Sequence, residues 1–193
     1  GDLTVNGTIS ANGVFWGDTS SSAGSVNITT RTLAGSGAIR ASGGTGSYTA
    51  AGGGRVAVKL TLPGADFSGY TGVIAAYGGV YPSRSGAAGT VYLETAAVGP
   101  GGGQVILNNN ATTTATSVLT HVTAALTPQP TELAGATVLV TNKVNAGVPA
   151  NCSIKDIVVS SNSTLNLMGK TLYVDTPEHP VDGPVYTNGG QII

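Results

Sequence analysis

Charged residues are scarce in this sequence, and their scarcity excludes several classes of protein. Only 9% of the 193 residues are charged, with 8 Lys and Arg against 9 Asp and Glu, whereas a typical soluble domain is about 25% charged. A nucleic-acid-binding protein needs a surplus of basic side chains to displace counterions from phosphates. We therefore expect no nucleic acid among the partners of this chain. A hydrophobic content of 40% likewise argues against intrinsic disorder.

Long apolar runs and paired cysteines are also missing. No stretch approaches the ~18 apolar residues that a membrane helix requires, so we expect no membrane span. Cys152 is the single cysteine, which rules out an intrachain disulfide. Its alternating apolar neighbours predict a buried, unreactive thiol. Together with abundant Thr, Ser, Asn and Gly, these features favour an extracellular or cell-surface protein of bacterial origin.

Glycine, in contrast, is abundant, and many of the 30 glycines belong to two repeated motifs. The first motif reads Gly-x-Ile-x-Ala-x-Gly, with copies that begin at Gly7, Gly37 and, in a looser form, Gly72. The second reads Gly-x-aliphatic-x-aliphatic, with copies that begin at Gly1, Gly24, Gly54, Gly89 and Gly103. Recurrence at intervals of about 30 residues is typical of repeat architectures.

These motifs predict an all-β fold. Their aliphatic residues are two apart, the period of a strand with one buried face, and glycines bracket each strand. We expect a right-handed parallel β-helix over residues 1–193 as a single domain, with regular repeats in 1–110 and less regular coils in 111–193. Inserts such as 43–54 and 80–89 are expected outside the core. An antiparallel β-sandwich or jelly roll is the alternative. Further strands are predicted at 136–141, 156–161, 164–168 and 171–175, and the stretch 111–126 is interpreted as strand or loop.

Four segments also resemble a known family. The residues are Gly52–Val58, Phe67–Gly69, Gly72–Gly79 and Ala87–Leu93, and they resemble a repeat block of very large, secreted, autotransporter-like or adhesin-like bacterial surface proteins. The match is best over 37–95, weaker over 1–36 and general after 103. This resemblance implies a parallel β-helix at the cell surface, and it implies a fold rather than an activity.

Catalytic and metal-binding patterns are weak. The carboxylates are dispersed along the chain, so we expect no enzyme, although a fragment of a polysaccharide lyase or hydrolase remains an alternative because folding could bring two carboxylates together. His121 lacks a neighbouring Ser–acid pattern and is interpreted as a surface or packed histidine. The run Gly99–Gly103 is interpreted as a turn. We expect no cofactor. One local cluster could bind a cation such as Ca²⁺, though a solvated loop is the preferred interpretation: Asp175, Glu178, His179 and Asp182.

The favoured function is therefore structural: a non-catalytic, extracellular β-solenoid module of a surface fibre, filament, sheath or adhesin. A carbohydrate-binding module is the alternative, with Trp16, Tyr77 and Tyr81 as stacking candidates and polysaccharide as partner. The preferred interpretation of Phe15, Trp16 and Phe67 is that they seal the corners of the core.

The two ends of the sequence resemble strands, which suggests a processed subunit or a piece of a longer chain. Terminal coils of a solenoid carry unpaired backbone groups. We therefore expect end-to-end self-association, or continuation in a longer chain, through Leu3 and Val5 at one end and Ile192 and Ile193 at the other.

Overall fold

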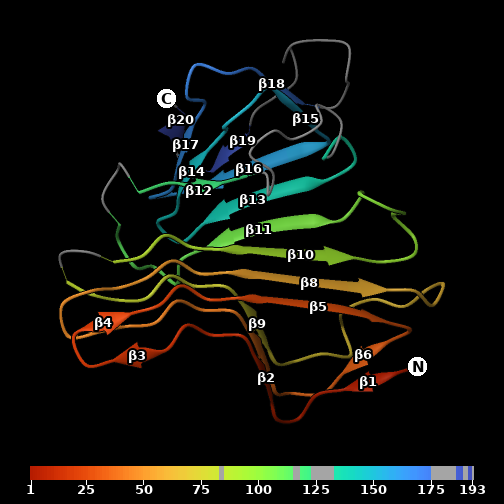
Figure 1. Cartoon of the computed structure of the whole chain (residues 1–193). Coiled ribbons are helices and arrows are strands. Elements are labelled where there is room, and N and C mark those ends of the chain that lie inside the picture. The colour runs from red at the N-terminus through yellow and green to blue at the C-terminus, as the bar shows by residue number, and fades with distance from the viewer. Residues whose placement is uncertain (83–84, 115–117, 123–132, 175–185, 189–190, 193) are drawn as a thin grey trace.

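The chain is all-β throughout its described part. The computed structural model describes every residue except 83–84, 115–117, 123–132, 175–185, 189–190 and 193. These described residues form short strands and no helix (Figure 1). Accordingly, no membrane-spanning helix is found among them. The prediction of the all-β class is confirmed.

The N-terminal half of the molecule, residues 1–94, stacks similar strands on one another. In the seven-stranded sheet β5 pairs in parallel with β8, and β8 with β10. In a second sheet β2 pairs in parallel with β7, and β7 with β9. The strands of this half are β1 (Leu3–Thr4), β2 (Thr8–Ser10), β3 (Phe15–Trp16), β4 (Thr19–Ser20), β5 (Ser25–Thr30), β6 (Leu33–Ala34), β7 (Ala38–Arg40), β8 (Arg55–Leu60), β9 (Val73–Ala75) and β10 (Thr90–Glu94).

The strand register aligns the repeated motifs. Ile9, Ile39 and Ile74 lie side by side in the β2–β7–β9 sheet, as the first motif predicts. Each pass of the chain around the core thus places an equivalent residue next to the previous one; the first pass is 1–30, the second 31–60 and the third 61–94. The opening Gly1–Val5 departs from the second motif, because Leu3 pairs with Leu33 of β6 rather than with β5 or β8.

The repeated glycines lie where successive backbones approach too closely for a side chain. A Cβ atom added to Gly54 would come within 1.8 Å of the Gly24 carbonyl oxygen, and one on Gly89 within 1.9 Å of the Gly54 oxygen. Gly72 meets the Gly37 oxygen in the same way, at 2.0 Å. No side chain tolerates such distances. The regular spacing of these glycines is therefore explained by close packing of the backbone of one pass on the backbone of the next.

The C-terminal half, residues 104–193, continues the seven-stranded sheet with larger buried side chains. Here β11 pairs in parallel with β13, and β13 with β16, which aligns Val105, Val138 and Ile157. Strands occupy all four segments predicted in this half. They are β11 (Gln104–Asn108), β12 (Thr120–His121), β13 (Thr137–Thr141), β14 (Asn145–Gly147), β15 (Cys152–Ile154), β16 (Asp156–Ser160), β17 (Thr164–Asn166), β18 (Leu172–Val174), β19 (Tyr186–Asn188) and β20 (Gln191–Ile192).

The chain reverses direction between the two halves. β10 and β11 are antiparallel, so their arrows point in opposite directions in the centre of the sheet (Figure 1). The motif copy at 103–107 is consequently not another parallel pass over β10, as the repeat pattern suggested. The turn between these strands, at 95–103, agrees with the predicted turn at 99–103.

The reversal also moves the hydrophobic core to the other face of the sheet. Residues directly opposite in an antiparallel pair share a face, and Tyr92 lies opposite Val105 while Val91 lies opposite Ile106. Val91 belongs to the core cluster of the N-terminal half. Val105 belongs to that of the C-terminal half. One continuous sheet therefore carries two cores, one on each face.

Cys152 lies inside the second core, as predicted. It is fully buried on β15 among aliphatic side chains, and this burial raises the pKa of its thiol. A raised pKa lowers the thiolate fraction, which is the nucleophilic form.

Three inserts project from the N-terminal half and stack on one another. We call them the first arm (12–21), the second arm (42–51) and the third arm (77–86); β3 and β4 belong to the first (Figure 1). The Gly44 amide donates to the Ser21 carbonyl at 3.0 Å, and the Gly79 amide donates to the Ala51 carbonyl at 2.8 Å. The inserts lie outside the core, as expected, but they form a stacked layer rather than separate loops.

Candidate functional site

One edge of the molecule offers unpaired strands in every sheet of the N-terminal half. β1, β2 and β5 each have a described neighbour on one side only. All three belong to the first pass, so their free backbone groups lie at the same end of the stack. We call this surface the open edge.

The apolar residues of the open edge are incompletely covered. Ile9 and Val26 are partly buried, whereas their partners in the next pass, Ile39 and Val56, are fully buried. Leu3 is partly buried as well, while Val5 already lies in the core. A further pass laid on this edge would bury the remaining apolar surface. Of the two predicted N-terminal stacking residues, Leu3 is therefore the accessible one.

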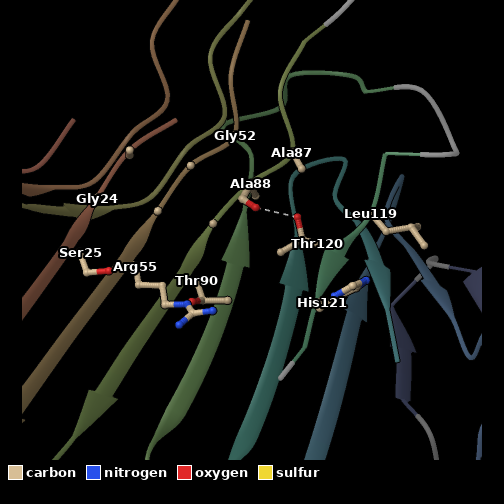
Figure 2. Close-up of a pocket in the computed structure, with 14 residues that line it drawn as sticks. Gly24, Ser25, Gly52, Arg55, Ala87, Ala88, Thr90, Leu119, Thr120 and His121 are labelled. Carbon is tan, nitrogen blue, oxygen red and sulfur yellow. Dashed lines mark hydrogen bonds between the residues drawn. The ribbon is translucent and has the colours of Figure 1, made fainter. Parts of the chain in front are cut away.

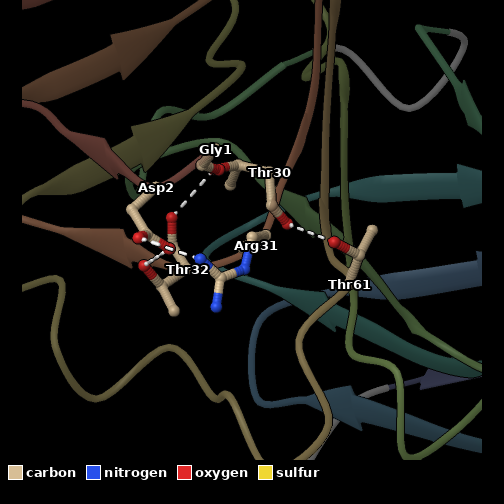
Figure 3. A network of polar contacts seen from close by, with 6 residues as sticks. All are labelled: Gly1, Asp2, Thr30, Arg31, Thr32 and Thr61. Atoms are coloured by element: carbon tan, nitrogen blue, oxygen red, sulfur yellow. Dashed lines mark hydrogen bonds and ion pairs between the residues drawn. The ribbon is translucent and has the colours of Figure 1, made fainter.

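A polar network holds the open edge in place (Figure 3). The Thr30 hydroxyl donates to the Gly1 carbonyl at 2.8 Å, and the Thr32 hydroxyl donates to an Asp2 carboxylate oxygen at 2.8 Å. Arg31 pairs with the same carboxylate at 3.5 Å. The edge is thus ordered before any partner binds, which lowers the entropic cost of association.

The opposite end of the stack is described in part. β19 and β20 end their sheets, and Ile192 pairs with Leu165 of β17. Ile192 therefore lies on a terminal strand, where the sequence predicted a stacking residue. Ile193 lies outside the described residues.

Three aromatic side chains on the first and second arms are largely exposed. Trp16 is 85% exposed, Tyr48 62% and Phe15 57%. The interpretation that Phe15 and Trp16 seal the core is wrong, because both side chains are largely exposed on the β3–β4 hairpin and neither belongs to a described core cluster. Phe67 packs against the N-terminal core, as that interpretation proposed.

The other two stacking candidates are less exposed. Tyr77 and Tyr81 are half-buried on the third arm. The Tyr81 amide donates to the Ser85 hydroxyl at 3.2 Å, and that hydroxyl donates to the Tyr81 carbonyl at 2.7 Å. Tyr48, which was not among the predicted site residues, is more exposed than either. Its position in a short Gly/Ser-rich insert was the available signal.

A groove of about 680 Å³ follows the stacked glycines (Figure 2). Arg55 and His121 contribute its basic side chains, and the Thr120 hydroxyl donates to the Ala88 carbonyl within it at 2.8 Å. None of its described lining residues is Asp or Glu. Glycoside hydrolysis generally uses two carboxyl groups, and the described lining supplies neither.

A buried carboxylate lies instead at the chain reversal. Glu94 pairs with Lys59 at 3.4 Å, accepts a hydrogen bond from the Tyr92 hydroxyl and accepts another from the Gly101 amide at 2.9 Å. We call Lys59, Tyr92, Glu94 and Gly101 the hairpin clamp. Burial acts to raise the pKa of Glu94, but the Tyr92, Gly101 and Lys59 interactions outweigh it and hold this pKa below its usual value. Burial and the adjacent Glu94 raise the pKa of Tyr92 to about 12.

The remaining candidate site is the acidic cluster Asp175, Glu178, His179 and Asp182, which lies outside the described residues. Comparison of the chain with protein-family models, with curated proteins and with solved structures found no match.

Proposed function

We propose that this chain is a non-catalytic β-solenoid module of an extracellular bacterial fibre, sheath or adhesin. The observation that carries the proposal is the alignment of equivalent residues in successive parallel strands, as in Ile9, Ile39 and Ile74. A stack of this kind extends by adding passes along one axis, and each pass contacts only its neighbours. Such a molecule acts as a spacer whose length follows the number of passes.

A right-handed parallel β-helix is the architecture that we propose for each half. Among the described pairs of strands only β3–β4 and β10–β11 are antiparallel, and Thr45 and Ala50 add one isolated antiparallel bridge. An antiparallel sandwich, in contrast, is built from antiparallel pairs throughout. Right-handed winding is the usual hand of parallel strand connections. The resemblance to large secreted surface proteins supports the same architecture for residues 37–95.

We further propose that the open edge receives another strand layer, either from a second copy or from a preceding segment of a longer chain. Addition of strands to an exposed sheet edge uses backbone hydrogen bonds for affinity and apolar side chains for register. The open edge has both, because β1, β2 and β5 are unpaired on one side and Leu3, Ile9 and Val26 are only partly covered.

A proline placed on the open edge tests this proposal. The Gly24 and Thr30 carbonyls accept hydrogen bonds from the Arg55 and Thr61 amides, at the two ends of β8. Strand residues alternate in direction, so the Asn27 backbone points away from β8. Asn27→Pro therefore removes an outward N–H without breaking the β5–β8 ladder. Asn27→Ala is the matched control, because it retains that N–H.

The measurement is the molar mass by light scattering over a wide range of protein concentrations. We expect the mass of the unmodified chain and of Asn27→Ala to rise with concentration, and that of Asn27→Pro to stay at the monomer value. A monomeric unmodified chain at every concentration would overturn self-association through this edge.

A further inference from the structure

We infer that the open edge is shaped to receive one further pass of the N-terminal kind, supplied by a preceding segment of a longer chain and stacked in the same parallel register as the three described passes. This inference rests on the structural proposal above and names the occupant of the edge. Two glycines of the first pass carry it, Gly7 and Gly24, for which the described chain holds no steric reason.

The strand register places two columns of equivalent glycines at the corners of the N-terminal half. They are Gly7, Gly37 and Gly72 in one column and Gly24, Gly54 and Gly89 in the other. In the second and third passes, a Cβ atom at these positions would lie 1.8–2.0 Å from the carbonyl oxygen of the equivalent glycine in the pass before. The glycines of these two passes are therefore required by the pass that precedes each of them.

The first glycine of each column lacks such a contact. A Cβ atom on Gly7 would have no described atom within 4 Å, and among described residues one on Gly24 would meet Ala11 alone, at an ordinary 3.5 Å. Neither glycine has a positive φ angle, which would favour glycine for another reason. A pass laid on the open edge in the same register would bring a carbonyl oxygen to the place of each missing Cβ atom.

A third column of glycines, at the base of the arms, shows that the steric reason can also lie inside one pass. A Cβ atom on Gly13 would lie 1.9 Å from the carbonyl oxygen of Ser21, which belongs to the same arm, and the equivalent glycines of the other two arms behave alike. Gly13 is therefore required without any preceding pass. Gly7 and Gly24 belong to the other kind of column, in which the preceding pass supplies the contact.

The occupant must resemble the N-terminal passes, because the C-terminal half builds the same corner with side chains. Ala136 and Lys155 directly precede β13 and β16, as Gly54 and Gly89 precede β8 and β10. Nevertheless β13 and β16 are stacked in parallel. Parallel stacking alone thus does not demand glycine at this position, whereas the close corners of the N-terminal half do. Gly24 therefore indicates a neighbour with an N-terminal kind of corner.

A second copy of the chain cannot supply that pass in the required orientation. Its third pass is closed by β11, which pairs with β10, so two copies would have to meet through their open edges, related by a two-fold axis. Such an axis makes the facing strands antiparallel or turns their cores to opposite faces of the sheet. Successive passes are instead parallel and share one core. A segment that precedes the first pass in a longer chain meets both conditions.

The first arm limits the shape of the added pass. In the second and third arms, Cβ atoms on Gly44 and Gly79 would lie 2.5 and 2.1 Å from a carbonyl oxygen of the arm before, whereas the first arm holds Val14 at the equivalent position. Another arm stacked in this register would clash with the Val14 side chain. The added pass therefore turns its corner without an arm in this place.

The test adds such a pass in front of Gly1. The added segment is a copy of residues 1–30 in which Asn-Gly replaces 12–23, because the Gly24 amide already donates to the Ala11 carbonyl at 2.8 Å, as in a two-residue turn. Thermal unfolding is followed by circular dichroism at a concentration at which light scattering shows monomers. We expect the extended chain to have a higher unfolding midpoint than the unmodified chain, because Ile9 and Val26 become buried.

Gly7→Ala is the decisive variant. In the unmodified monomer it should leave the unfolding midpoint unchanged, because the new methyl group would meet no described atom. In the extended chain it should lower the midpoint by about 2–10 °C, because the methyl group would meet a carbonyl oxygen of the added pass. Gly13→Ala is the matched control: its clash lies inside the first pass, so it should lower the midpoint equally in both chains.

A second extension, the exact copy of residues 1–30 with its arm, guards against a failure of the designed turn. It should stabilise the chain less than the first extension does, because of Val14, and Gly7→Ala is measured in both. The inference is wrong if neither extension raises the midpoint, or if Gly7→Ala is harmless in the extension that does. It is equally wrong if Gly7→Ala destabilises the unmodified monomer as much as Gly13→Ala.

These results separate the inference from self-association between copies. A chain that stays monomeric at every concentration, but is destabilised by Gly7→Ala only when extended, would contradict pairing between copies and support the preceding pass. A chain that associates through the open edge, with Gly7→Ala harmless in both extensions, would contradict this inference alone.

Discussion

The two halves of the molecule solve the same packing problem with different residues. The N-terminal half brings backbones together at its corners through glycine, as at Gly54 against Gly24. The C-terminal half holds most of the large, fully buried side chains, among them Leu107, Ile157 and Leu165. Stacked strands are therefore compatible with two kinds of interior, one with close backbone contacts at its corners and one filled by aliphatic side chains.

The two interiors differ in the amino-acid substitutions that they can accommodate. Where a carbonyl oxygen occupies the space of a missing Cβ, an added methyl group can be accommodated only if the backbone itself moves. Where side chains fill the space, a lost methylene leaves a cavity that neighbours partly close. The halves should therefore be sensitive to opposite kinds of substitution.

The largest effect is expected from truncating a core residue. Ile157 and Ile39 are both fully buried, one in each half, and replacing either by Ala should lower the free energy of unfolding by about 2–5 kcal/mol. Because one sheet runs through both halves, each variant should shift a single transition, measured by urea unfolding with circular dichroism. Two separated transitions in Ile157→Ala would show that the halves unfold independently.

The next effect comes from filling a backbone contact. Gly54→Ala should lower the free energy of unfolding by about 1–3 kcal/mol, since its Cβ would meet a carbonyl oxygen. Gly147→Ala is the control in the C-terminal half, where the new Cβ would first meet the movable Met168 and Leu119 side chains at 3.0 and 3.1 Å. Chemical denaturation of both variants measures the contrast. An equal loss at both positions would contradict the distinction between the halves.

The smallest effect concerns the hairpin clamp that joins the halves. The folded-state pKa of Glu94 is held below its unfolded value, so its contribution to stability is present above the unfolded pKa and is lost as the pH falls through the folded one. Between about pH 5 and pH 3 the unmodified chain should therefore lose more stability than Glu94→Gln. At pH 7, Glu94→Gln should cost about 1.5 kcal/mol.

Urea midpoints of both proteins across this pH range measure the effect. Asp18→Asn is a suitable control, because Asp18 is an exposed residue of the first arm and does not belong to the clamp. Parallel pH curves for Glu94→Gln and the unmodified chain would contradict a role of the clamp in stability.

Residue periodicity was sufficient to predict the strands and much of their stacking. The positions of Ile9, Ile39 and Ile74 predict which residues align, because equal spacing within a repeated motif leads to equal positions in successive passes. Of the four strands predicted in the C-terminal half, those at 164–168 and 171–175 follow from the same alternation, whereas those at 136–141 and 156–161 follow from continuous apolar runs. The boundaries differ by a residue or two, as strand ends usually do.

The reversal at β10–β11 could not be predicted from periodicity alone. Val91 and Leu93 alternate just as Val105 and Leu107 do, so the pattern is the same whether the strands run parallel or antiparallel. The glycine-rich run 99–103 indicated a turn, but the direction of the chain beyond it depends on contacts between distant residues.

The exposed aromatic residues were predicted as a site only in part. A Trp–Gly pair indicates a tight turn as well as a packed corner, and the sequence does not show which. What exposes Trp16 is the pairing of β3 with β4 beyond the edge of the core.

The change of strand direction and the change of core face at the β10–β11 hairpin occur together, and their combination has a geometric meaning. Reversing the strands alone would turn a winding of one hand into its mirror image, and so would moving the core alone. Performing both is equivalent to a half-turn about the stacking direction, which is a proper rotation and preserves chirality. If each half winds as we propose, the two halves therefore wind in the same sense, although the chain turns back on itself in the middle of a sheet.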